Sequence, residues 1–215
     1  MGEITRTNTT LLIFAGGRAT RLGGVNKALV ALCGRPLIEH VLARLGGSVA
    51  RVLVSANRDA ERFAGLGLQV VADLEPSFPG PLAALEAAAD VVETEWVLTA
   101  PCDAPFLPSD LLERFRARQA ELLEAGRDPD AYVIRTEHHT QGAVACVRSR
   151  RLAEARSSLA AGEHRLGRWY GALGAAEVPV LGFEEAFANL NTPEELAAAQ
   201  TRCKEEAMER HAAGR

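Results

Sequence analysis

The chain has 215 residues, of which 47% are hydrophobic and 24% are charged, and its formal net charge at pH 7 is −4. This length is enough for one large α/β domain with a full core. The small negative net charge produces no overall positive potential that would attract nucleic acid, so we expect no nucleic-acid partner. The polar start MGEITRTNTT does not resemble an export signal, and no apolar stretch approaches a membrane span, so we expect no membrane association.

The cysteines exclude a zinc site of the usual kind. They are widely spaced, without a C-x-x-C pair and without a histidine at a zinc-ligand interval: Cys33, Cys102, Cys146 and Cys203. We therefore expect reduced thiols in a cytoplasmic protein.

Short strand-like runs alternate with helical segments in the first half of the chain. The pattern predicts strands at 11–14, 50–56, 68–73 and 96–100, with helices at 35–45, 58–66 and 81–93. This βαβ order predicts an α/β fold with a mostly parallel sheet.

The second half has a less regular pattern. We expect a helix over 109–125 that Ser109 caps, and a last helix that begins at Thr192-Pro193-Glu194-Glu195 with Thr192 as its cap. Between them the sequence predicts strands near 131–135, 142–147 and 177–183 and helices at 150–161 and 165–173. The tail after Cys203 is poor in apolar residues and is expected to fray.

Residues 11–27, LLIFAGGRATRLGGVNK, join an apolar strand to a glycine-rich turn. Glycines without Cβ atoms let backbone N–H groups approach anionic oxygens, and the cations add positive charge. The residues concerned are Gly16, Gly17, Gly23, Gly24, Arg18, Arg21 and Lys27. The alternative is a solvated glycine loop with surface arginines, but the preceding strand and the cations favour a site for a phosphate chain.

Two known glycine motifs do not fit this segment. Lys27 is followed by Ala28 rather than by the Ser or Thr of a P-loop. The glycines form two adjacent pairs rather than the G-x-G-x-x-G of a dinucleotide site.

Ligands gather where parallel strands end, so the residues just past each strand are further candidates. They are Ser55, Asn57, Arg58, Asp73 and Asp103. Asp103 lies between Pro101 and Pro105, which restrict the backbone; it is either a turn former or an oxygen ligand for the cation that a triphosphate requires. We favour the ligand, because Ser109 is available to cap the next helix.

Gly80 lies between Pro79 and Pro81 and precedes a predicted helix. The segment is either a simple proline-bounded turn or a place where the backbone approaches a flat ligand such as a nucleobase. No histidine lies beside a nucleophile in sequence, so we assign the histidines no role.

Several segments, in order, carry a family resemblance: FAGGRATRLGGVNKALVALCGRPLIEHV, SANR, VVAD, PGPLAAL, PCDAPFLPSDL and FANLNTPEEL. Together they resemble the molybdenum cofactor guanylyltransferases of the MobA type, within the nucleotidyltransferases that transfer NMP from NTP. The resemblance implies a Rossmann-like three-layer fold. It also implies a reaction in which GTP and a molybdopterin-type cofactor give the guanine dinucleotide cofactor and pyrophosphate, with other molybdenum cofactor or molybdoenzyme maturation proteins as partners.

The resemblance also implies roles for single residues. Phe14, Ala15 and Gly16 correspond to main-chain contacts with GTP, Lys27 to the phosphate lysine and Asp73 to a nucleotide contact. Asp103 corresponds to the Mg²⁺ ligand, and Asn189 and Asn191 to the asparagines near the reacting phosphates. Residues 1–215 would form one domain, with a nucleotide-binding half at about 8–110, an acceptor-side half at about 111–200 and the tail at 201–215.

The sequence departs from the family pattern at three places. Asn26 stands where the family often has Asp, Ser55 where it has Asn, and Gln141-Gly142 where it has His-Pro. A serine donates a hydrogen bond but reaches less far than an asparagine, which affects the nucleotide contact. The change at 141–142 concerns the acceptor side, and nucleotidyl transfer from CTP or to a sugar or alcohol phosphate remains the alternative.

Overall fold

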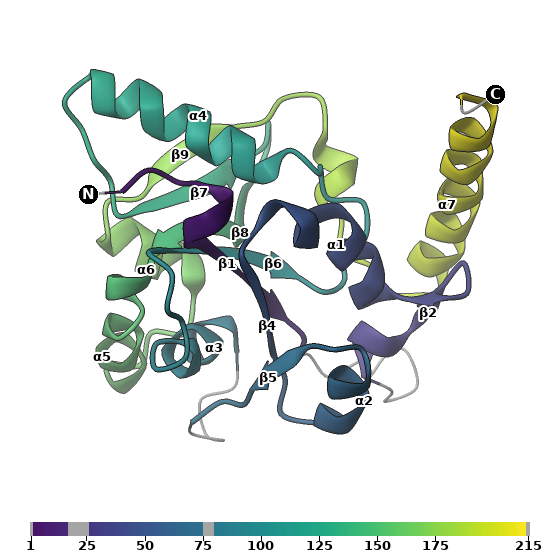
Figure 1. Ribbon diagram of the computed structural model, residues 1–215, viewed down its shortest axis with the longest axis horizontal. Helices are drawn as coiled ribbons and strands as arrows, with labels where there is room; N and C mark the ends of the chain where they lie inside the picture. Colours follow the sequence, from purple (N-terminus) through teal and green to yellow (C-terminus); the bar gives the residue numbers. More distant parts are fainter. Residues whose placement is uncertain (1, 17–25, 75–79, 214–215) are drawn as a thin grey trace.

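A computed structural model describes residues 2–16, 26–74 and 80–213 (Figure 1). Its central seven-stranded sheet has the order β5-β4-β1-β6-β8-β7-β9. The strands are β1 Thr9–Phe14, β4 Arg51–Ser55, β5 Gln69–Val71, β6 Trp96–Pro101, β7 Ala131–Arg135, β8 Thr140–Arg148 and β9 Ala176–Pro179. β1 pairs in parallel with both β4 and β6, so the mostly parallel sheet is confirmed.

β8 is the exception, because it runs antiparallel to β6 and to β7. A tight turn joins β7 to β8, in which the Thr136 N–H donates to the His139 carbonyl at 2.9 Å. A parallel connection would need a crossover of about a dozen residues or more. With β8 reversed, β7 ends at the same edge of the sheet as β1, β4 and β6. We call this edge the carboxyl edge.

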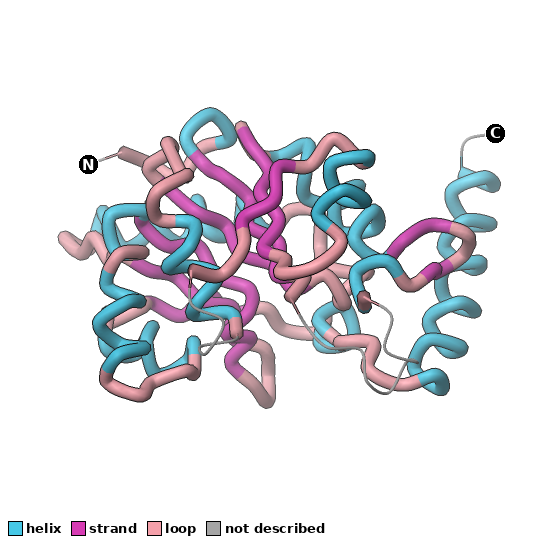
Figure 2. Tube along the Cα trace, turned by 90° about the horizontal axis from the view of Figure 1, so that it is seen from below, coloured by secondary structure: helices cyan, strands magenta, loops and turns pink. Residues whose placement is uncertain are grey.

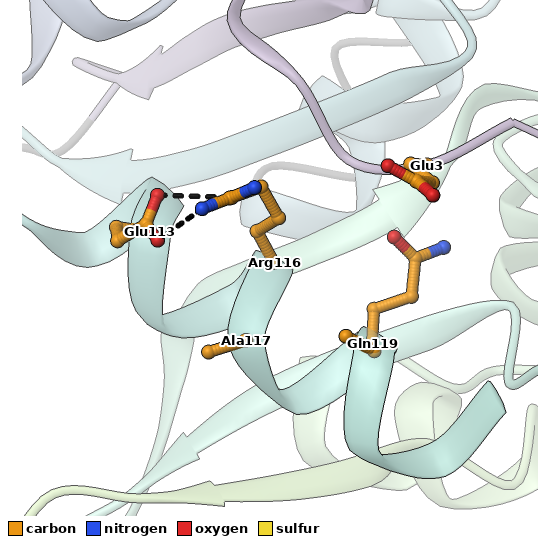
Figure 3. A pocket seen from close by; sticks show the side chains of 6 residues that line it. Glu3, Glu113, Arg116, Ala117 and Gln119 are labelled. Carbon is orange, nitrogen blue, oxygen red and sulfur yellow. Dashed lines mark hydrogen bonds and ion pairs between the residues drawn. The ribbon is translucent and has the colours of Figure 1, made fainter. Parts of the chain in front are cut away.

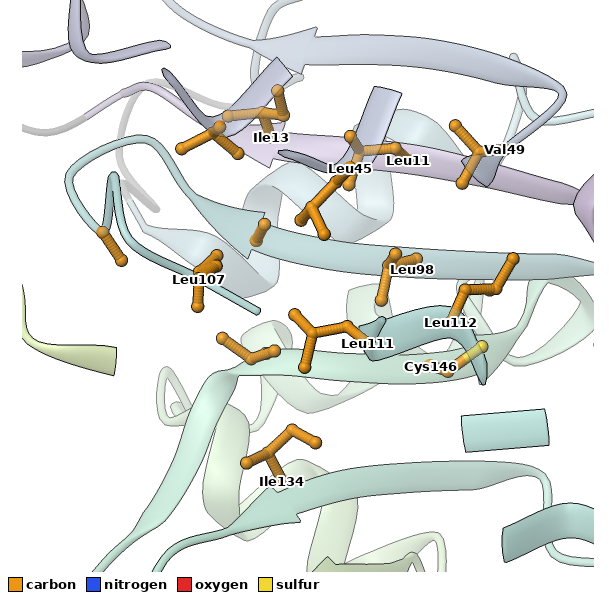
Figure 4. Close-up of a cluster of buried hydrophobic side chains, with 14 of the residues drawn as sticks. Leu11, Ile13, Leu45, Val49, Leu98, Leu107, Leu111, Leu112, Ile134 and Cys146 are labelled. Carbon is orange, nitrogen blue, oxygen red and sulfur yellow. The ribbon is translucent and has the colours of Figure 1, made fainter. Parts of the chain in front are cut away.

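Helices cover both faces of the sheet, and the alternation of side chains along β1 shows why. Leu11 and Ile13 pack on one face with α1 Leu37–Leu45, α2 Ala60–Gly65 and α4 Leu111–Glu124 (Figure 4). Leu12 packs on the other with α3 Pro81–Ala88, α5 Glu154–Ala160 and α6 Leu166–Ala172. All three β1 side chains are fully buried, as a strand of a sheet covered on both faces requires. The predicted three-layer α/β fold is confirmed.

A smaller unit lies beside the sheet. A hairpin of β2 Ala31–Leu32 and β3 Arg35–Pro36 packs against the last helix, α7 Pro193–Ala213, which stands at one side of the molecule (Figures 1 and 2). The contact is apolar and contains Leu32, Leu37, Phe106, Leu190 and Ala199. The short 3-10 helices are η1 Arg6–Asn8, η3 Lys27–Leu29, η4 Gly46–Ser48, η5 Ser149–Arg151 and η6 Glu184–Phe187.

Several element boundaries differ from the predictions. The helix expected from Arg35 begins at Leu37, because Arg35 and Pro36 pair with β2. Ser109 is not the cap of α4: the N-cap position is Asp110, and it makes no side-chain cap bond. The helix expected to fray after Cys203 continues to Ala213.

The start of α7 agrees with the sequence. The Glu195 N–H donates to Thr192 Oγ1 at 3.2 Å, and the Thr192 N–H donates to Glu195 Oε2 at 2.9 Å. These reciprocal bonds form the expected capping box.

Of the helices in the described ranges, none has both the length and the apolar character that crossing a bilayer requires.

Candidate active site

Three predicted site residues from distant parts of the chain meet at the carboxyl edge. Lys27 Nζ donates hydrogen bonds to Asp103 Oδ2 and, at 2.6 Å, to Asn191 Oδ1. The Lys27 and Asp103 side chains are only 10% and 14% exposed. We call these three residues the Lys27 cluster. Because they are separated by up to 164 positions in sequence, only the fold brings them together.

Backbone contacts fix each member of the Lys27 cluster. Lys27 begins the buried η3 helix, which Asn26 caps by accepting a bond from the Ala28 N–H at 3.2 Å. Asp103 follows β6, and its carbonyl accepts a bond from the Leu190 N–H at 2.9 Å. Asn191 follows Leu190 directly and precedes the capped start of α7. The β6 end and the segment before α7 are therefore tied to each other.

Asn189 lies beside this cluster through the main chain. Its carbonyl accepts a long bond from Asn191 Nδ2 at 3.5 Å, and both asparagines are exposed. The structure therefore places both predicted asparagines at the carboxyl edge, with Asn191 in direct contact with Lys27.

Asp73 belongs to a separate pair. Asn57 Nδ2 donates to Asp73 Oδ2 at 2.7 Å, and the Asp73 N–H donates to Asn57 Oδ1 at 2.8 Å. Burial raises the pKa of the Asp73 carboxyl, the Asn57 bond opposes this, and the Glu86 charge adds to it. Asp73 follows β5, two strands from β1, so it lies at the same edge but is not bonded to the Lys27 cluster.

The main chain at 14–16 is partly engaged by the sheet. The Phe14 carbonyl accepts from the Cys102 N–H at 3.1 Å, and the Ala15 N–H donates to the Ser55 carbonyl at 2.9 Å. Ser55 ends β4 and is only 4% exposed. At Gly16 an added Cβ would meet no described atom within 4 Å, so packing against these residues does not require the glycine.

Gly80 is the N-cap of α3 and has φ 144°, with Pro81 in the first turn. This backbone conformation favours glycine whatever its role. Gly17, Arg18, Arg21, Gly23 and Gly24 lie outside the described residues, as does most of the loop before Gly80.

The oxygen atoms of the Lys27 cluster are suitable ligands for a hard cation. Asp103 and Asn191 both direct oxygen atoms at a positive charge, the Lys27 ammonium, and oxygen is the ligand that Mg²⁺ prefers. No group of three or more His, Cys, Asp or Glu side chains that could hold a metal is present in the described part of the chain. A divalent cation here would therefore take few protein ligands and complete its shell with substrate phosphates, as Mg²⁺ commonly does.

Cys102 adjoins this site but is not a nucleophile. Burial raises the pKa of its thiol far above the usual range, and the neighbouring Asp103 charge raises it further. A thiol that stays protonated does not attack phosphorus.

The antiparallel course of β8 places Gln141 and Gly142 near the carboxyl edge as well. Gln141 pairs with Ile134 of β7, just after an irregularity in the β7–β8 register. A Cβ on Gly142 would lie 3.6 Å from the Gly167 nitrogen, in ordinary contact with α6. These residues therefore lie at the same edge of the sheet as the Lys27 cluster.

A pocket on another part of the surface lies between the N-terminal segment and α4 (Figure 3). Its lining includes Glu3, Gln119 and the ion pair of Glu113 with Arg116. The Ile4 N–H donates a hydrogen bond to Oε1 of Gln119 at 2.6 Å, near the amino end of β1. The pocket is thus at the opposite edge from Lys27, and we assign it no part in the reaction.

Comparison with known proteins identifies the family. The sequence model of the MobA-like NTP transferase domain matches residues 11–178. The chain belongs to the MobA-like NTP transferase family. This agrees with the predicted nucleotidyltransferase activity and with the resemblance seen in the motifs.

Relatives of this MobA-like transferase match it over nearly their whole length. It is 38% identical to the molybdenum cofactor guanylyltransferase of Polynucleobacter asymbioticus over 90% of this chain and 96% of that one. It is 42% identical to the protein of the same name from Burkholderia lata, over 87% and 93%. The structure of molybdopterin-guanine dinucleotide biosynthesis protein A from Archaeoglobus fulgidus has a TM-score of 0.73 and 23% identity, covering 91% and 99%.

One residue near this site, Asp59, belongs to none of the sequence motifs described above. Asp59 accepts a hydrogen bond from Asn26 at 3.0 Å, one residue before Lys27. It follows Arg58 just past the end of β4, so the strand-end rule that singled out Ser55, Asn57 and Arg58 could have found it.

Proposed function

We propose that this MobA-like transferase transfers GMP from GTP to the molybdopterin-bound molybdenum cofactor, giving molybdopterin guanine dinucleotide cofactor and pyrophosphate. The observation that carries the proposal is the 38% and 42% identity to guanylyltransferases over nearly the full length of both chains. The Lys27 cluster supplies the chemistry that such a transfer needs.

The reaction is an in-line substitution at the α-phosphorus of GTP. An oxygen of the acceptor's terminal phosphate forms a bond to the α-phosphorus, and the bond to the oxygen that bridges to the β-phosphate breaks. Pyrophosphate leaves with that oxygen. A phosphate monoester is already an anionic nucleophile near neutral pH, so the site needs no general base.

In this scheme Lys27 neutralises charge on the triphosphate and on the departing pyrophosphate, and Arg21 and the amides of Gly16 and Gly17 assist it. Asp103 and Asn191 would hold Mg²⁺, which when bound stabilises negative charge on the phosphate oxygens. Asn189 lies beside them. The Lys27 ammonium donates to two oxygen acceptors and can exchange them for phosphate oxygens.

Base recognition is assigned mainly to the backbone. Guanine offers N1–H and N2–H₂ donors, and a carbonyl oxygen has two lone pairs, so the carbonyls at 14–16 can accept them even where, as at Phe14, one bond is already made. Gly80 lets a flat base approach, while Asp73 and Ser55 are further contacts. An unpaired buried polar group costs about 1–3 kcal/mol, so two of them predict a preference for GTP over CTP of about a hundredfold or more.

The test is pyrophosphate release from each of the four NTPs, with and without the molybdopterin acceptor. We expect release only with GTP and the acceptor together. Comparable turnover with CTP would assign the protein to cytidylyl transfer. Pyrophosphate release with a sugar or alcohol phosphate in place of the pterin would show that the acceptor is not the molybdopterin cofactor.

A further inference from the structure

Asp59 holds an unusual position at the start of α2. Its backbone is left-handed, with φ 59° and ψ 28°, and its side chain does not cap the helix. An aspartate at an N-cap ordinarily accepts a bond from an N–H of the first turn. Here Asp59 Oδ2 instead accepts a bond from Asn26 Nδ2 at 3.0 Å, across 33 positions of sequence.

This bond fixes the orientation of the Asn26 side chain. Asn26 is 6% exposed, and its Oδ1 accepts a bond from the Ala28 N–H at 3.2 Å. A carboxylate can only accept, so it binds the amide nitrogen and directs the amide oxygen toward Ala28. The bond from Ala28 caps η3, which begins with Lys27, and the bond to Asp59 holds the Asn26 side chain that forms this cap.

We propose that Asp59 is a positioning residue for Lys27, acting through Asn26. Asp59 orients the Asn26 amide, the amide holds the first turn of η3, and that turn aims the Lys27 ammonium at Asp103 and Asn191. The inference rests on the proposed function, which gives Lys27 its role toward the triphosphate.

If Asp59 had a purely structural role, it would stabilise the start of α2 and would not affect Lys27. The Asp59 carbonyl accepts bonds from the Arg62 N–H at 3.0 Å and the Phe63 N–H at 3.2 Å. Glycine keeps that carbonyl and adopts a positive φ without strain. The change Asp59→Gly therefore removes the carboxylate and leaves the start of α2 intact.

The experiment measures the thermal midpoint together with kcat and KM for GTP in the full chain. For Asp59→Gly we expect kcat/KM to fall about tenfold, with both a higher KM and a lower kcat, because the charge of Lys27 is displaced from its productive position. The midpoint should change little, because glycine relieves the positive φ at this position while the buried Asn26 amide loses one acceptor. Wild-type kcat/KM in this variant would overturn the proposal.

An exchange of the two side chains provides the rescue. Asn26→Asp alone places two carboxylates against each other and should lower kcat/KM. The double variant Asn26→Asp with Asp59→Asn restores one amide facing one carboxylate, and the carboxylate at 26 can still accept from Ala28. We expect it to recover most of the loss, and a double variant no better than Asn26→Asp would contradict the proposal.

Lys27→Ala, measured in parallel, separates this inference from the proposed function. If Lys27→Ala is defective, Asp59→Gly should add no further loss in that background, because it acts through Lys27. An additive loss would overturn the positioning role of Asp59 and leave the proposed function standing. Wild-type GTP kinetics in Lys27→Ala would overturn both the role of Lys27 and the positioning.

Discussion

Two cation clusters at opposite edges of the same sheet differ in construction. At the amino end of β6, Arg148 pairs with Glu95, Asp128 and Asp130, its guanidinium lies 4.3 Å from the Trp96 ring centre, and its side chain is 2% exposed. At the carboxyl edge, Lys27 has one carboxylate and one amide as partners and is more exposed.

The Arg148 cluster stabilises the fold, whereas Lys27 can exchange its protein partners for a ligand. Arg150 and Arg151 also pair with Asp130, and Arg151 pairs with Glu154, so three arginines face four carboxylates and little charge is left over. A planar guanidinium stacked on a ring is fixed in place, whereas an ammonium is a compact charge that can rotate its donors to new partners. We therefore expect changes at Arg148 to affect stability and changes at Lys27 to affect the reaction.

Arg148→Met should produce the largest effect. Removing the guanidinium leaves carboxylates partly buried without their main partner, which costs about 3–5 kcal/mol for a buried pair. Urea denaturation would measure the loss. The folded fraction should keep wild-type KM for GTP, and a raised KM would show that the two edges are not independent.

Asp103→Asn should reduce the rate by about a hundredfold to a thousandfold at saturating Mg²⁺, because it removes a charged oxygen ligand from the reacting phosphates. The amide oxygen can still accept from Lys27, so the urea midpoint should change little. Pyrophosphate release is the measurement, and Asp128→Asn at the other edge is the matched control. Wild-type turnover in folded Asp103→Asn would remove the metal role.

Asp73→Asn should give the smallest effect, visible as a pH dependence. Burial raises the pKa of Asp73 in the folded protein, so folding favours the protonated carboxyl. The protonated carboxyl therefore adds to the free energy of unfolding below the ordinary Asp pKa, and this stabilisation is lost as the pH rises through the raised pKa. Relative to Asp73→Asn, the wild type should therefore lose stability between acidic and neutral pH. Thermal midpoints of both proteins across that range would show it, and a difference of opposite sign would contradict the assignment.

The parts of the fold that the sequence predicted are those with strong local patterns. The apolar run of β1 and the Thr192–Glu195 capping box specify their own structure, and the strand-end rule placed Asp103 at the carboxyl edge. Lys27 was predicted from its charge beside the glycines.

What the sequence could not predict depends on contacts between distant segments. The hairpin at 31–36 has strands of two residues, too short for a periodic pattern. Ser109 has the right chemistry for a cap, but α4 begins one residue later than that requires. The bonds of Lys27 with Asn191 and of Asn26 with Asp59 exist only once β1, β4 and β6 are aligned.

Titration calorimetry of GTP with Mg²⁺ into wild type, Lys27→Ala and Arg148→Met tests whether the Lys27 cluster binds the nucleotide. We expect GTP affinity to fall at least about tenfold in Lys27→Ala, since a charge on the bound triphosphate is lost, and to stay at the wild-type value in Arg148→Met. Unchanged affinity in Lys27→Ala would show that the Lys27 cluster does not bind the nucleotide.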